Sequence, residues 1–205
     1  MGGKLNVKPN GEKQKMILSI LIPSLEKRGL LLKKLREHLY NQIELLNAEK
    51  LVEVIALIDN KELSTGEKRN KLLFLAKGKY IIFIDDDDWI PDYYINELLI
   101  AAKSNADCFA INGIHIDRGN RVKWFISKGF DNVNQNKNGE IIYLRKTNHI
   151  TAVKRELALK HGFPNKSNAE DKDYSDNLNS YLKSEYVIKK PMYEYRESLG
   201  IKEYV

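Results

Sequence analysis

Four consecutive aspartates, Asp85 to Asp88, are the residues of this sequence whose type and spacing most directly suggest chemistry. Like charges in close proximity raise one another's pKa unless a cation lies among them, so the cluster favours a bound metal ion. Hard divalent ions such as Mg²⁺ and Mn²⁺ bind carboxylate oxygens and share their remaining positions with water and phosphate. The aspartates therefore predict a Mg²⁺ or Mn²⁺ site that also anchors a diphosphate. The alternative is a solvated acidic turn, with Asp88 capping a helix that begins near Pro91.

The aspartates follow an apolar segment, residues 80–84, that has the pattern of a strand buried on both faces. Two similar apolar runs precede it, at residues 16–22, before Pro23, and at residues 51–58, and the leucines between those two runs have helical spacing. Strands alternating with helices in this way predict an α/β sheet with parallel strands. Ligands of such sheets lie outside the carboxyl ends of the strands, which is where the aspartates are found.

The second half of the chain has a different pattern, typical of antiparallel strands. Residues 113–116, 122–126 and 140–144 are short alternating segments separated by turns rich in Gly and Asn. A helix is expected at about residues 169–183, and an edge strand at residues 186–196. The expected fold is therefore α/β, with parallel strands first and a small antiparallel region after them.

The chain has 205 residues, a length that suits one domain. Residues 1–15 carry Gly, Pro and Lys without periodicity and are predicted to be a flexible arm, which leaves residues 16–205 as that domain. No apolar run approaches the roughly 18 residues of a membrane-spanning helix. The single cysteine, Cys108, excludes disulfide frameworks and multi-cysteine zinc sites, and it favours a reducing, cytoplasmic location.

The charge balance is basic, with 34 Lys and Arg against 28 Asp and Glu and a formal net charge of +6. This excess is compatible with nucleic acid, acidic glycans, nucleotides or anionic membrane surfaces as partners, and it does not choose between them. If the aspartates occupy one cleft, the remaining surface is more basic than the sum suggests. The residues expected on that surface are Lys27, Arg28, Lys33, Lys34, Arg36, Lys189 and Lys190.

Residues 80–88 resemble the strand and Asp-x-Asp-Asp block of the GT-A glycosyltransferases, particularly the inverting enzymes of family 2. Five further segments resemble motifs of that family, in the family's order. They are the first strand and nucleotide-binding loop at residues 20–24, the second-strand aspartate at Asp59, the Gly…Arg-Asn segment at residues 66–70, the Glu-Asp pair at Glu170 and Asp171, and the closing Pro-Leu-Tyr-x-Tyr-Arg strand at residues 191–196. The resemblance covers about residues 16–198.

The resemblance implies a GT-A fold, in which a Rossmann-like mixed α/β sheet is flanked by helices and carries a small antiparallel acceptor-side region. It implies a nucleotide-sugar-binding half at residues 16–112 and an acceptor-binding half at residues 113–205. The implied activity is metal-dependent, inverting transfer of a sugar from a nucleotide-sugar donor, expected to be a UDP-sugar, to a hydroxyl group. The acceptor stays open among a glycan, a lipid-linked glycan and a hydroxylated base in DNA, and the charge leaves room for an anionic polysaccharide or contact with a membrane surface.

The same resemblance assigns roles to individual residues. It implies that Asp171 is the catalytic base, that Pro23, Ser24, Asp59, Arg69, Asp85 and Asp86 bind the nucleotide-sugar, that Asp87, Asp88 and His149 bind Mn²⁺ or Mg²⁺, and that Trp89 and Glu170 lie on the acceptor side. Each type of residue also has a structural alternative. These alternatives are a solvated ion pair with Glu67 or Asp59 for Arg69, the favourable first turn of a helix for Glu170 and Asp171, a hydrogen-bonded structural role for His149, and packing in place of sugar stacking for Trp89 and Trp124.

Two other functions compete with sugar transfer. A nucleotidyltransferase would use a related α/β fold with a metal-binding aspartate. Residues 23–29 are weakly similar to the phosphate loop of that class, which is rich in Gly and contains Arg and Lys. A nucleic-acid-binding module without catalysis is supported by the net charge alone. Dinucleotide oxidoreductases and P-loop enzymes are excluded, because the sequence has neither Gly-x-Gly-x-x-Gly nor a Walker loop. The oligomeric state stays open.

Overall fold

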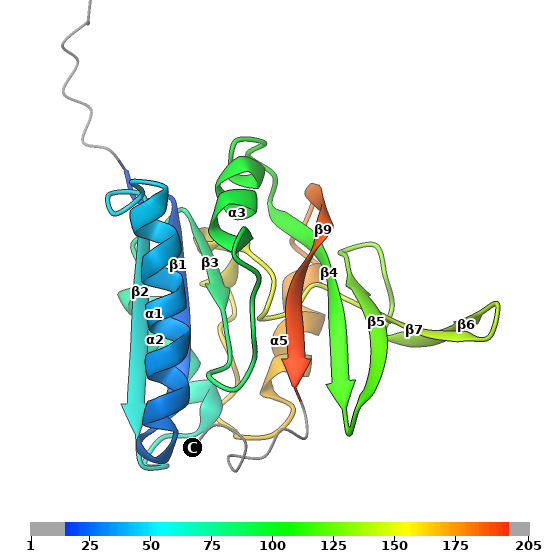
Figure 1. The fold of residues 1–205 in the computed structure, drawn as a ribbon, viewed down its shortest axis with the longest axis horizontal. Coiled ribbons are helices and arrows are strands. Elements are labelled where there is room, and N and C mark those ends of the chain that lie inside the picture. The colour runs from blue at the N-terminus through cyan, green and yellow to red at the C-terminus, as the bar shows by residue number, and fades with distance from the viewer. Residues whose placement is uncertain (1–14, 197–205) are drawn as a thin grey trace, which may run out of the picture.

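Figure 1 shows the fold in a computed structural model of the chain, which describes residues 15–196. The predicted flexible arm lies outside the described residues except for Lys15. The strands are β1 (Leu18–Leu25), β2 (Val52–Asp59), β3 (Tyr80–Phe83), β4 (Cys108–Asp117), β5 (Asn120–Ile126), β6 (Val133–Lys137), β7 (Glu140–Arg145), β8 (Val153–Lys154) and β9 (Glu185–Arg196). The helices are the 3₁₀ turn η1 (Glu26–Arg28), α1 (Gly29–Leu45), α2 (Thr65–Leu75), α3 (Tyr94–Ala102), α4 (Arg155–Ala158) and α5 (Glu170–Asn179).

All nine strands of the described residues belong to one mixed sheet, in the order β2-β1-β3-β8-β4-β5-β7-β6, with β9 paired to β4. The first three strands of this order are parallel, as the sequence predicted. Strand β1 continues through Pro23 to Leu25, beyond the expected end. Pro23 lies past the last residue of β1 that pairs with β3, so only β2 flanks the strand there, and a proline is tolerated at such an edge.

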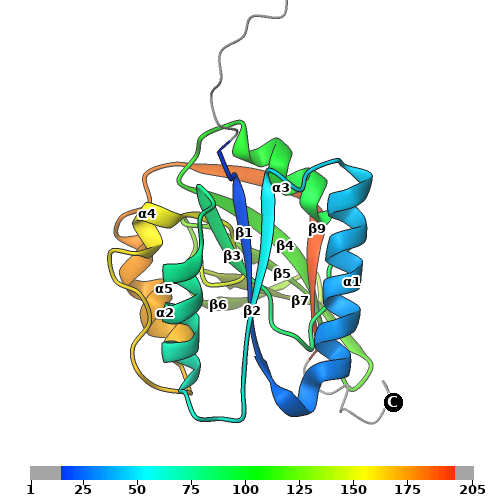
Figure 2. The same ribbon diagram turned by 90° about the vertical axis from the view of Figure 1, so that its left-hand side faces the viewer.

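Helices cover both faces of the parallel part of the sheet (Figure 2). Helices α1 and α3 pack on one face, where Leu35, Leu39 and Ile95 join the larger apolar cluster. Helices α2, α4 and α5 pack on the other face, where Leu72 and Tyr174 join a second cluster. The strands therefore carry apolar residues on both faces, which explains their continuous apolar runs in the sequence.

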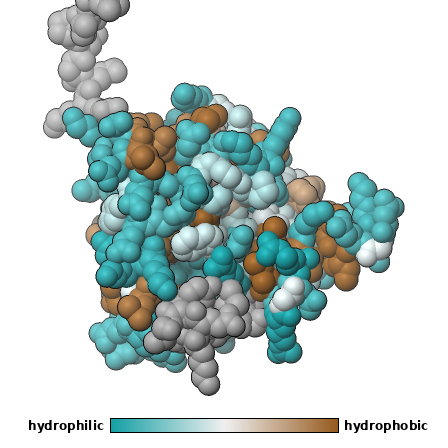
Figure 3. Space-filling model, in the orientation of Figure 1, coloured by the Kyte–Doolittle hydropathy of each residue, from teal (hydrophilic) through white to brown (hydrophobic). Residues whose placement is uncertain are grey.

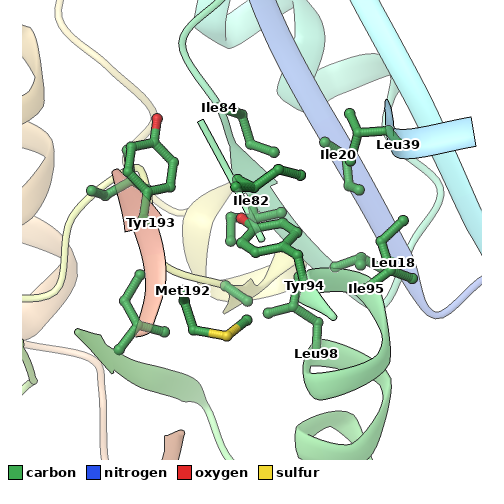
Figure 4. Packing of buried hydrophobic residues seen from close by; sticks show 14 of the residues in the cluster. Leu18, Ile20, Leu39, Ile82, Ile84, Tyr94, Ile95, Leu98, Met192 and Tyr193 are labelled. Atoms are coloured by element: carbon green, nitrogen blue, oxygen red, sulfur yellow. The ribbon is translucent and has the colours of Figure 1, made fainter. Parts of the chain in front are cut away.

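Figure 4 shows the larger cluster from close by, with Ile82 of β3, and Ile84 just after this strand, packed near Tyr94 of α3 and Tyr193 of β9. Ile82 and Ile84 are fully buried. Asp85 directly follows Ile84, so its backbone is held by the closely packed core. Cys108 at the start of β4 is also fully buried, and burial raises the pKa of its thiol to about 12.

The second half is attached to the parallel strands through the short strand β8, which pairs antiparallel with both β3 and β4. Strand β4 is continuous over ten residues and begins before the segment expected at residues 113–116. It pairs antiparallel with β5 and parallel with β9. Strand β6 was not predicted. It pairs with β7 in a hairpin, residues 133–145, that projects from the sheet in Figure 1, and we call this hairpin the wing.

The surface is mostly hydrophilic in the view of Figure 3, and apolar side chains form separate patches on it. Over the described residues, no helix combines the length and the apolar composition needed to cross a bilayer.

Candidate active site

A cleft of about 690 Å³ opens at the carboxyl ends of β1 and β3 and is lined by all four aspartates, Asp85 to Asp88. We call it the aspartate cleft. Pro23 and Ser24 line it from the end of β1, and Arg69 lines it from α2. Five of the six residues predicted to bind a nucleotide-sugar therefore lie together, at the edge of the sheet where the fold class places its ligands.

Asp85 and Asp86 are each neutralised by an arginine. Arg69 Nη2 lies 3.1 Å from Asp85 Oδ1, and Arg28 Nη1 donates to Asp86 Oδ1 at 2.7 Å. Ser24 Oγ donates to the other Asp86 oxygen at 2.5 Å. Burial opposes the ionisation of Asp85, but the interactions with Arg69 and His149 outweigh it and hold its pKa well below the ordinary value. Asp85 is thus charged, and hydrogen bonds fix the positions of both carboxylates.

Asp87 has the most exposed side chain of the block, at 36 % against 27 % for Asp85. Arg28 Nη1 lies 3.0 Å from its Oδ2. Burial raises the pKa of Asp87, and the charges of Asp85 and Asp86 add to this rise against the attraction of Arg28. A further cation in the cleft would therefore be attracted most strongly to Asp87.

Asp88 is directed to the last strand of the sheet. Both of its oxygens accept hydrogen bonds from β9, at 2.7 Å from the Tyr193 hydroxyl and at 2.9 Å from the Arg196 N–H. Burial and the charge of Asp85 raise the pKa of Asp88 well above its ordinary value. Within residues 15–196, no three His, Cys, Asp or Glu side chains are arranged as ligands of one metal ion. A metal in this cleft would accordingly depend on few protein oxygens and on the ligand's own phosphates.

Asp59, predicted to hold the nucleotide, lies at the end of β2 beside the wall of the aspartate cleft. It pairs with Lys68 and accepts a hydrogen bond from the Leu63 N–H at 2.9 Å. Burial opposes its ionisation, but these hydrogen bonds outweigh it and lower the pKa of Asp59. Lys68 also donates to the Ser24 carbonyl at 2.7 Å, so it ties the end of β2 to the end of β1. Lys68 was not among the residues predicted for the site.

Arg69 is almost completely buried and has two carboxylate partners on different elements. Its Nη1 lies 2.6 Å from Glu170 Oε1 at the start of α5, while its Nη2 contacts Asp85. The guanidinium also lies over the rings of Phe83 and Phe163, at 5.9 and 5.5 Å. The solvated pair with Glu67 or Asp59 is not what forms. Arg69 instead couples the aspartate block to the helix that carries Asp171.

A second cleft of about 740 Å³ adjoins the first on the antiparallel side of the molecule. Tyr143, Trp124, His115 and Tyr195 line it, and we call it the aromatic cleft. Asp171 and His149 line it as well, and Tyr195 lines both clefts.

His149 lies where the two clefts meet. Its Nε2 is 3.5 Å from Asp85 Oδ2 and its Nδ1 is 3.9 Å from Asp171 Oδ2. These distances are longer than normal hydrogen bonds, and neither ring nitrogen has a hydrogen-bond partner within the described residues. The side chain of Asp171 is 43 % exposed. A line of three ionisable groups, Asp85, His149 and Asp171, thus runs from one cleft to the other.

Comparison with known proteins identifies the family. The model of glycosyl transferase family 2 matches residues 42–162, which is more than half of the chain. The chain belongs to glycosyltransferase family 2. The sequence-based assignment of the family and of its transferase class is confirmed.

One relative found by sequence and two solved structures with a similar fold are consistent with this family. A "Putative glycosyltransferase EpsH" of Bacillus subtilis (strain 168) is 25 % identical over 154 residues, which are 70 % of this chain and 45 % of that protein. The S. aureus TarS 1-349 structure in complex with UDP-GlcNAc superposes with a TM-score of 0.61 at 18 % identity, over 90 % of this chain and 60 % of that chain. The mannosyltransferase PcManGT of Pyrobaculum calidifontis, in complex with GDP-Man and Mn²⁺, gives a TM-score of 0.54 at 15 % identity, over 93 % of this chain and 59 % of that chain. The predicted GT-A fold is confirmed, and the chain spans about half the length of its curated relative.

Two residues predicted for the acceptor side of this family 2 domain have structural partners elsewhere. Trp89 stacks on His38 of α1, with ring centroids 4.7 Å apart, and lines neither the aspartate cleft nor the aromatic cleft. Glu170 is buried against Arg69. Trp124, for which packing and sugar stacking both stood open, lines the aromatic cleft but is only 5 % exposed, so most of its ring is packed in the larger apolar cluster.

The position predicted for Arg28 is wrong. This arginine was expected on the basic outer surface, yet it lies in the aspartate cleft on Asp86 and Asp87. The signal that could have found it is its position five residues after Pro23, in the loop that leaves the carboxyl end of β1. Loops at that edge of the sheet carry ligand-binding residues whatever the net charge of the chain.

Proposed function

We propose that this chain transfers a sugar from a UDP-sugar to an acceptor hydroxyl with inversion at the anomeric carbon. The observation that carries the proposal is the line Asp85, His149 and Asp171, which joins the aspartate cleft to the aromatic cleft. Inversion needs a donor on one side of the anomeric carbon and a carboxylate on the other. The fold neighbour TarS was solved with UDP-GlcNAc, which supports a nucleotide-sugar as the donor.

The aspartate cleft is the proposed donor site. Pro23, Ser24 and Asp59 would contact the nucleoside, and Asp85 and Asp86 the ribose or sugar, because they lie at adjacent strand ends. Arg28 and Arg69 are the cations nearest to the aspartate block, so they are the proposed partners of the diphosphate.

Asp87 is the residue that would hold a divalent ion, Mn²⁺ or Mg²⁺. Its hard, partly exposed carboxylate fits such an ion, whereas the oxygens of Asp88 are occupied by β9. His149 is the third predicted ligand. Among residues 15–196 its ring nitrogens have no hydrogen-bond partner, and its Nε2 lies 3.5 Å from Asp85 Oδ2, so it would be available to the ion. When bound, the ion would offset the negative charge that develops on the departing nucleoside diphosphate. PcManGT, a fold neighbour, was solved with Mn²⁺.

Asp171 is the proposed general base. It projects into the aromatic cleft, where it can accept the proton of the attacking hydroxyl. Its neighbour Glu170 is held by Arg69, and the same arginine holds Asp85. Through these ion pairs, the position of the base is fixed relative to the donor cleft, and orientation of this kind supplies much of the rate of a bimolecular transfer.

Family membership is the reason to set aside the two competing functions. The nucleotidyltransferase and the non-catalytic nucleic-acid-binding module each predict some of the charge pattern, but neither accounts for the family match over residues 42–162.

A thermal-shift panel tests the proposal. The protein is heated with UDP-, GDP-, CDP- and TDP-sugars, with and without Mn²⁺, because a ligand at 100 times its Kd stabilises the native state by about 2.7 kcal/mol. A UDP-sugar is expected to give the largest rise in melting temperature, and Mn²⁺ to increase it. The control is Asp92→Ala, which removes an exposed carboxylate from the same loop and should leave the rise unchanged. If no nucleotide-sugar raises the melting temperature, the proposal is wrong.

A further inference from the structure

The strand register brings aromatic side chains onto one face of the antiparallel region. Trp124 of β5 lies opposite Gly113 of β4 on one side and opposite Tyr143 of β7 on the other. On the far side of β4, Tyr195 of β9 lies opposite His115. Residues directly opposite one another in a sheet point to the same face, so these rings form one row across four strands.

Gly113 makes the row continuous. A Cβ atom built on Gly113 would lie 2.3 Å from the ring of Trp124 and 2.1 Å from the carbonyl oxygen of Tyr193. Only glycine therefore leaves room for the indole to lie across β4. The His115 ring then contacts both ends of the row, with its centroid 5.0 Å from the Tyr195 ring and 5.9 Å from the Tyr143 ring.

The polar part of the lining includes three side-chain amides beside the charged residues Arg145, Asp171 and Lys172. Asn132, Asn134 and Asn148 line the cleft near the aromatic row. Each amide group can both donate and accept hydrogen bonds, as a sugar hydroxyl can. Aromatic faces with a few convergent amides are suited to a ring that has apolar C–H faces and hydroxyl edges.

The cations of the lining are poorly placed to hold a polyanion. Arg145 donates to the carbonyls of Val133 and Leu144, at 3.0 and 2.8 Å, and to Asn134 Oδ1 at 3.0 Å. Its guanidinium also lies over the Tyr143 ring at 4.9 Å. Arg145 thus holds β7 to β6 within the wing. The other cation, Lys172, directly follows the carboxylate of Asp171 at the same rim. A phosphate chain would need several uncommitted cations in a row.

We propose that the aromatic cleft binds a neutral sugar ring of a glycan acceptor, stacked on the aromatic row with a hydroxyl directed to Asp171. This inference rests on the proposed function and adds the chemical class of the acceptor. It favours a neutral glycan over the anionic acceptors that the net charge alone allowed, and a DNA acceptor becomes an outcome of the test.

The test measures binding to the 205-residue chain by saturation-transfer NMR. The neutral probes are methyl glycosides of glucose, galactose and N-acetylglucosamine, and the anionic probes are a short DNA duplex and an acidic oligosaccharide. At least one neutral glycoside is expected to bind, and its affinity should not change when the salt concentration is raised. The variant Tyr143→Leu, which keeps an apolar side chain but removes the aromatic face, should weaken this binding about tenfold.

The matched control is Phe125→Leu. Phe125 is an exposed ring of the neighbouring strand, adjacent in sequence to Trp124 and so on the opposite face of the sheet. This variant should bind the glycoside like the wild-type protein. The inference is overturned if no neutral glycoside binds, if the two variants lose binding equally, or if only the anionic probes bind and do so less tightly at higher salt.

Nucleotide-sugar binding is measured on the same samples, so that the two proposals fail separately. If a nucleotide-sugar binds and no neutral glycoside does, only the acceptor inference is wrong. If no nucleotide-sugar binds, the proposed function is wrong whatever the glycosides do.

Discussion

The aspartate cleft and the aromatic cleft are similar in size, about 690 and 740 Å³, but the protein builds them from different materials. The aspartate cleft is made of charges that largely neutralise one another, such as Arg28 on Asp86 and Arg69 on Asp85. The lining of the aromatic cleft includes four rings and three side-chain amides, with Arg145, Asp171 and Lys172 as its charged residues. This difference indicates that the first cleft is organised for a charged ligand, and the second for a ligand recognised by its shape and hydroxyl groups.

The difference also separates binding from chemistry. Asp87 belongs to the aspartate cleft alone, whereas Asp171 belongs to the aromatic cleft. Substitutions on the two sides should therefore differ in their effects on donor affinity and on the rate of transfer.

Asp171→Asn should have the largest effect. Without the carboxylate that accepts the proton, the transfer rate should fall about a thousandfold, while the affinity for the donor stays within about twofold, because positioned general bases contribute factors of this size to the rate. Steady-state rates of UDP release and donor titration by calorimetry measure the two quantities. A large loss of donor affinity in this variant would contradict the assignment of Asp171 to the acceptor side.

Asp87→Ala should have the opposite pattern. In the presence of Mn²⁺, the donor should bind about a hundredfold more weakly, since an ion–carboxylate contact is lost from a partly buried site. Without Mn²⁺, the variant and the wild-type protein should bind the donor alike. Calorimetric titrations with and without the ion give the comparison, and Asp92→Ala serves again as the control. An unchanged Mn²⁺ effect would show that Asp87 does not hold the ion.

Much of the aspartate cleft could be predicted from the sequence, because its residues follow strands whose apolar runs are continuous. Asp85 to Asp88 come directly after the buried residues of β3, and the carboxyl ends of neighbouring parallel strands meet at one edge. Arg28 was the exception, because net charge was used to place it where the position of its loop was the better guide.

The aromatic cleft was largely beyond the sequence, because its members are brought together by register. Strand β6 is entirely exposed and mostly polar, so it lacks the apolar alternation that marks a strand. Nothing in the sequence pairs Trp124 with Gly113 and Tyr143, or shows that Trp89 would stack on His38 instead of facing a ligand. A one-residue change of register would move Trp124 to the other face of the sheet.

Gly113→Ala tests whether the aromatic row depends on that register. The new methyl group would overlap the Trp124 ring and the Tyr193 carbonyl, so the variant should be less stable by about 2 kcal/mol. The control is Gly29→Ala, where no atom lies within 4 Å of the new methyl group and the helix should gain about 0.5 kcal/mol. Urea unfolding measures both. Equal stability of the two variants would mean that the row is not closely packed at Gly113.

Asp107→Asn should have the smallest effect on stability. It tests the contacts that hold β8 and the start of β9 beside β4. Asp107 pairs with Lys154 of β8 at 2.9 Å and accepts hydrogen bonds from the N–H groups of Lys183 and Ser184 before β9. Burial opposes its ionisation, but these contacts outweigh it and lower the pKa of Asp107 to about 2. Since solvent screens a pair near the surface, we expect the variant to lose only about 1 kcal/mol at neutral pH.

The pH dependence of that loss has a definite sign. The pKa of Asp107 is lower in the folded state than in the unfolded chain, so its contribution is complete above the unfolded value, about 4. The difference in stability between the wild-type protein and Asp107→Asn should therefore disappear as the pH falls toward about 2. A difference that stays constant over this range would assign the loss to packing instead of charge.

The central claim, that Asp171 acts from the side of the anomeric carbon opposite the diphosphate, has one direct test that needs no acceptor. The UDP-α-sugar that most raises the melting temperature is labelled with ¹³C at its anomeric carbon and incubated with excess protein and Mn²⁺, so that water takes the place of the acceptor. Carbon NMR then records which anomer of the free sugar appears before the two anomers interconvert. The account predicts the β-anomer from the wild-type protein and no product from Asp171→Asn. An initial α-anomer, or equal β-product from both proteins, would contradict it.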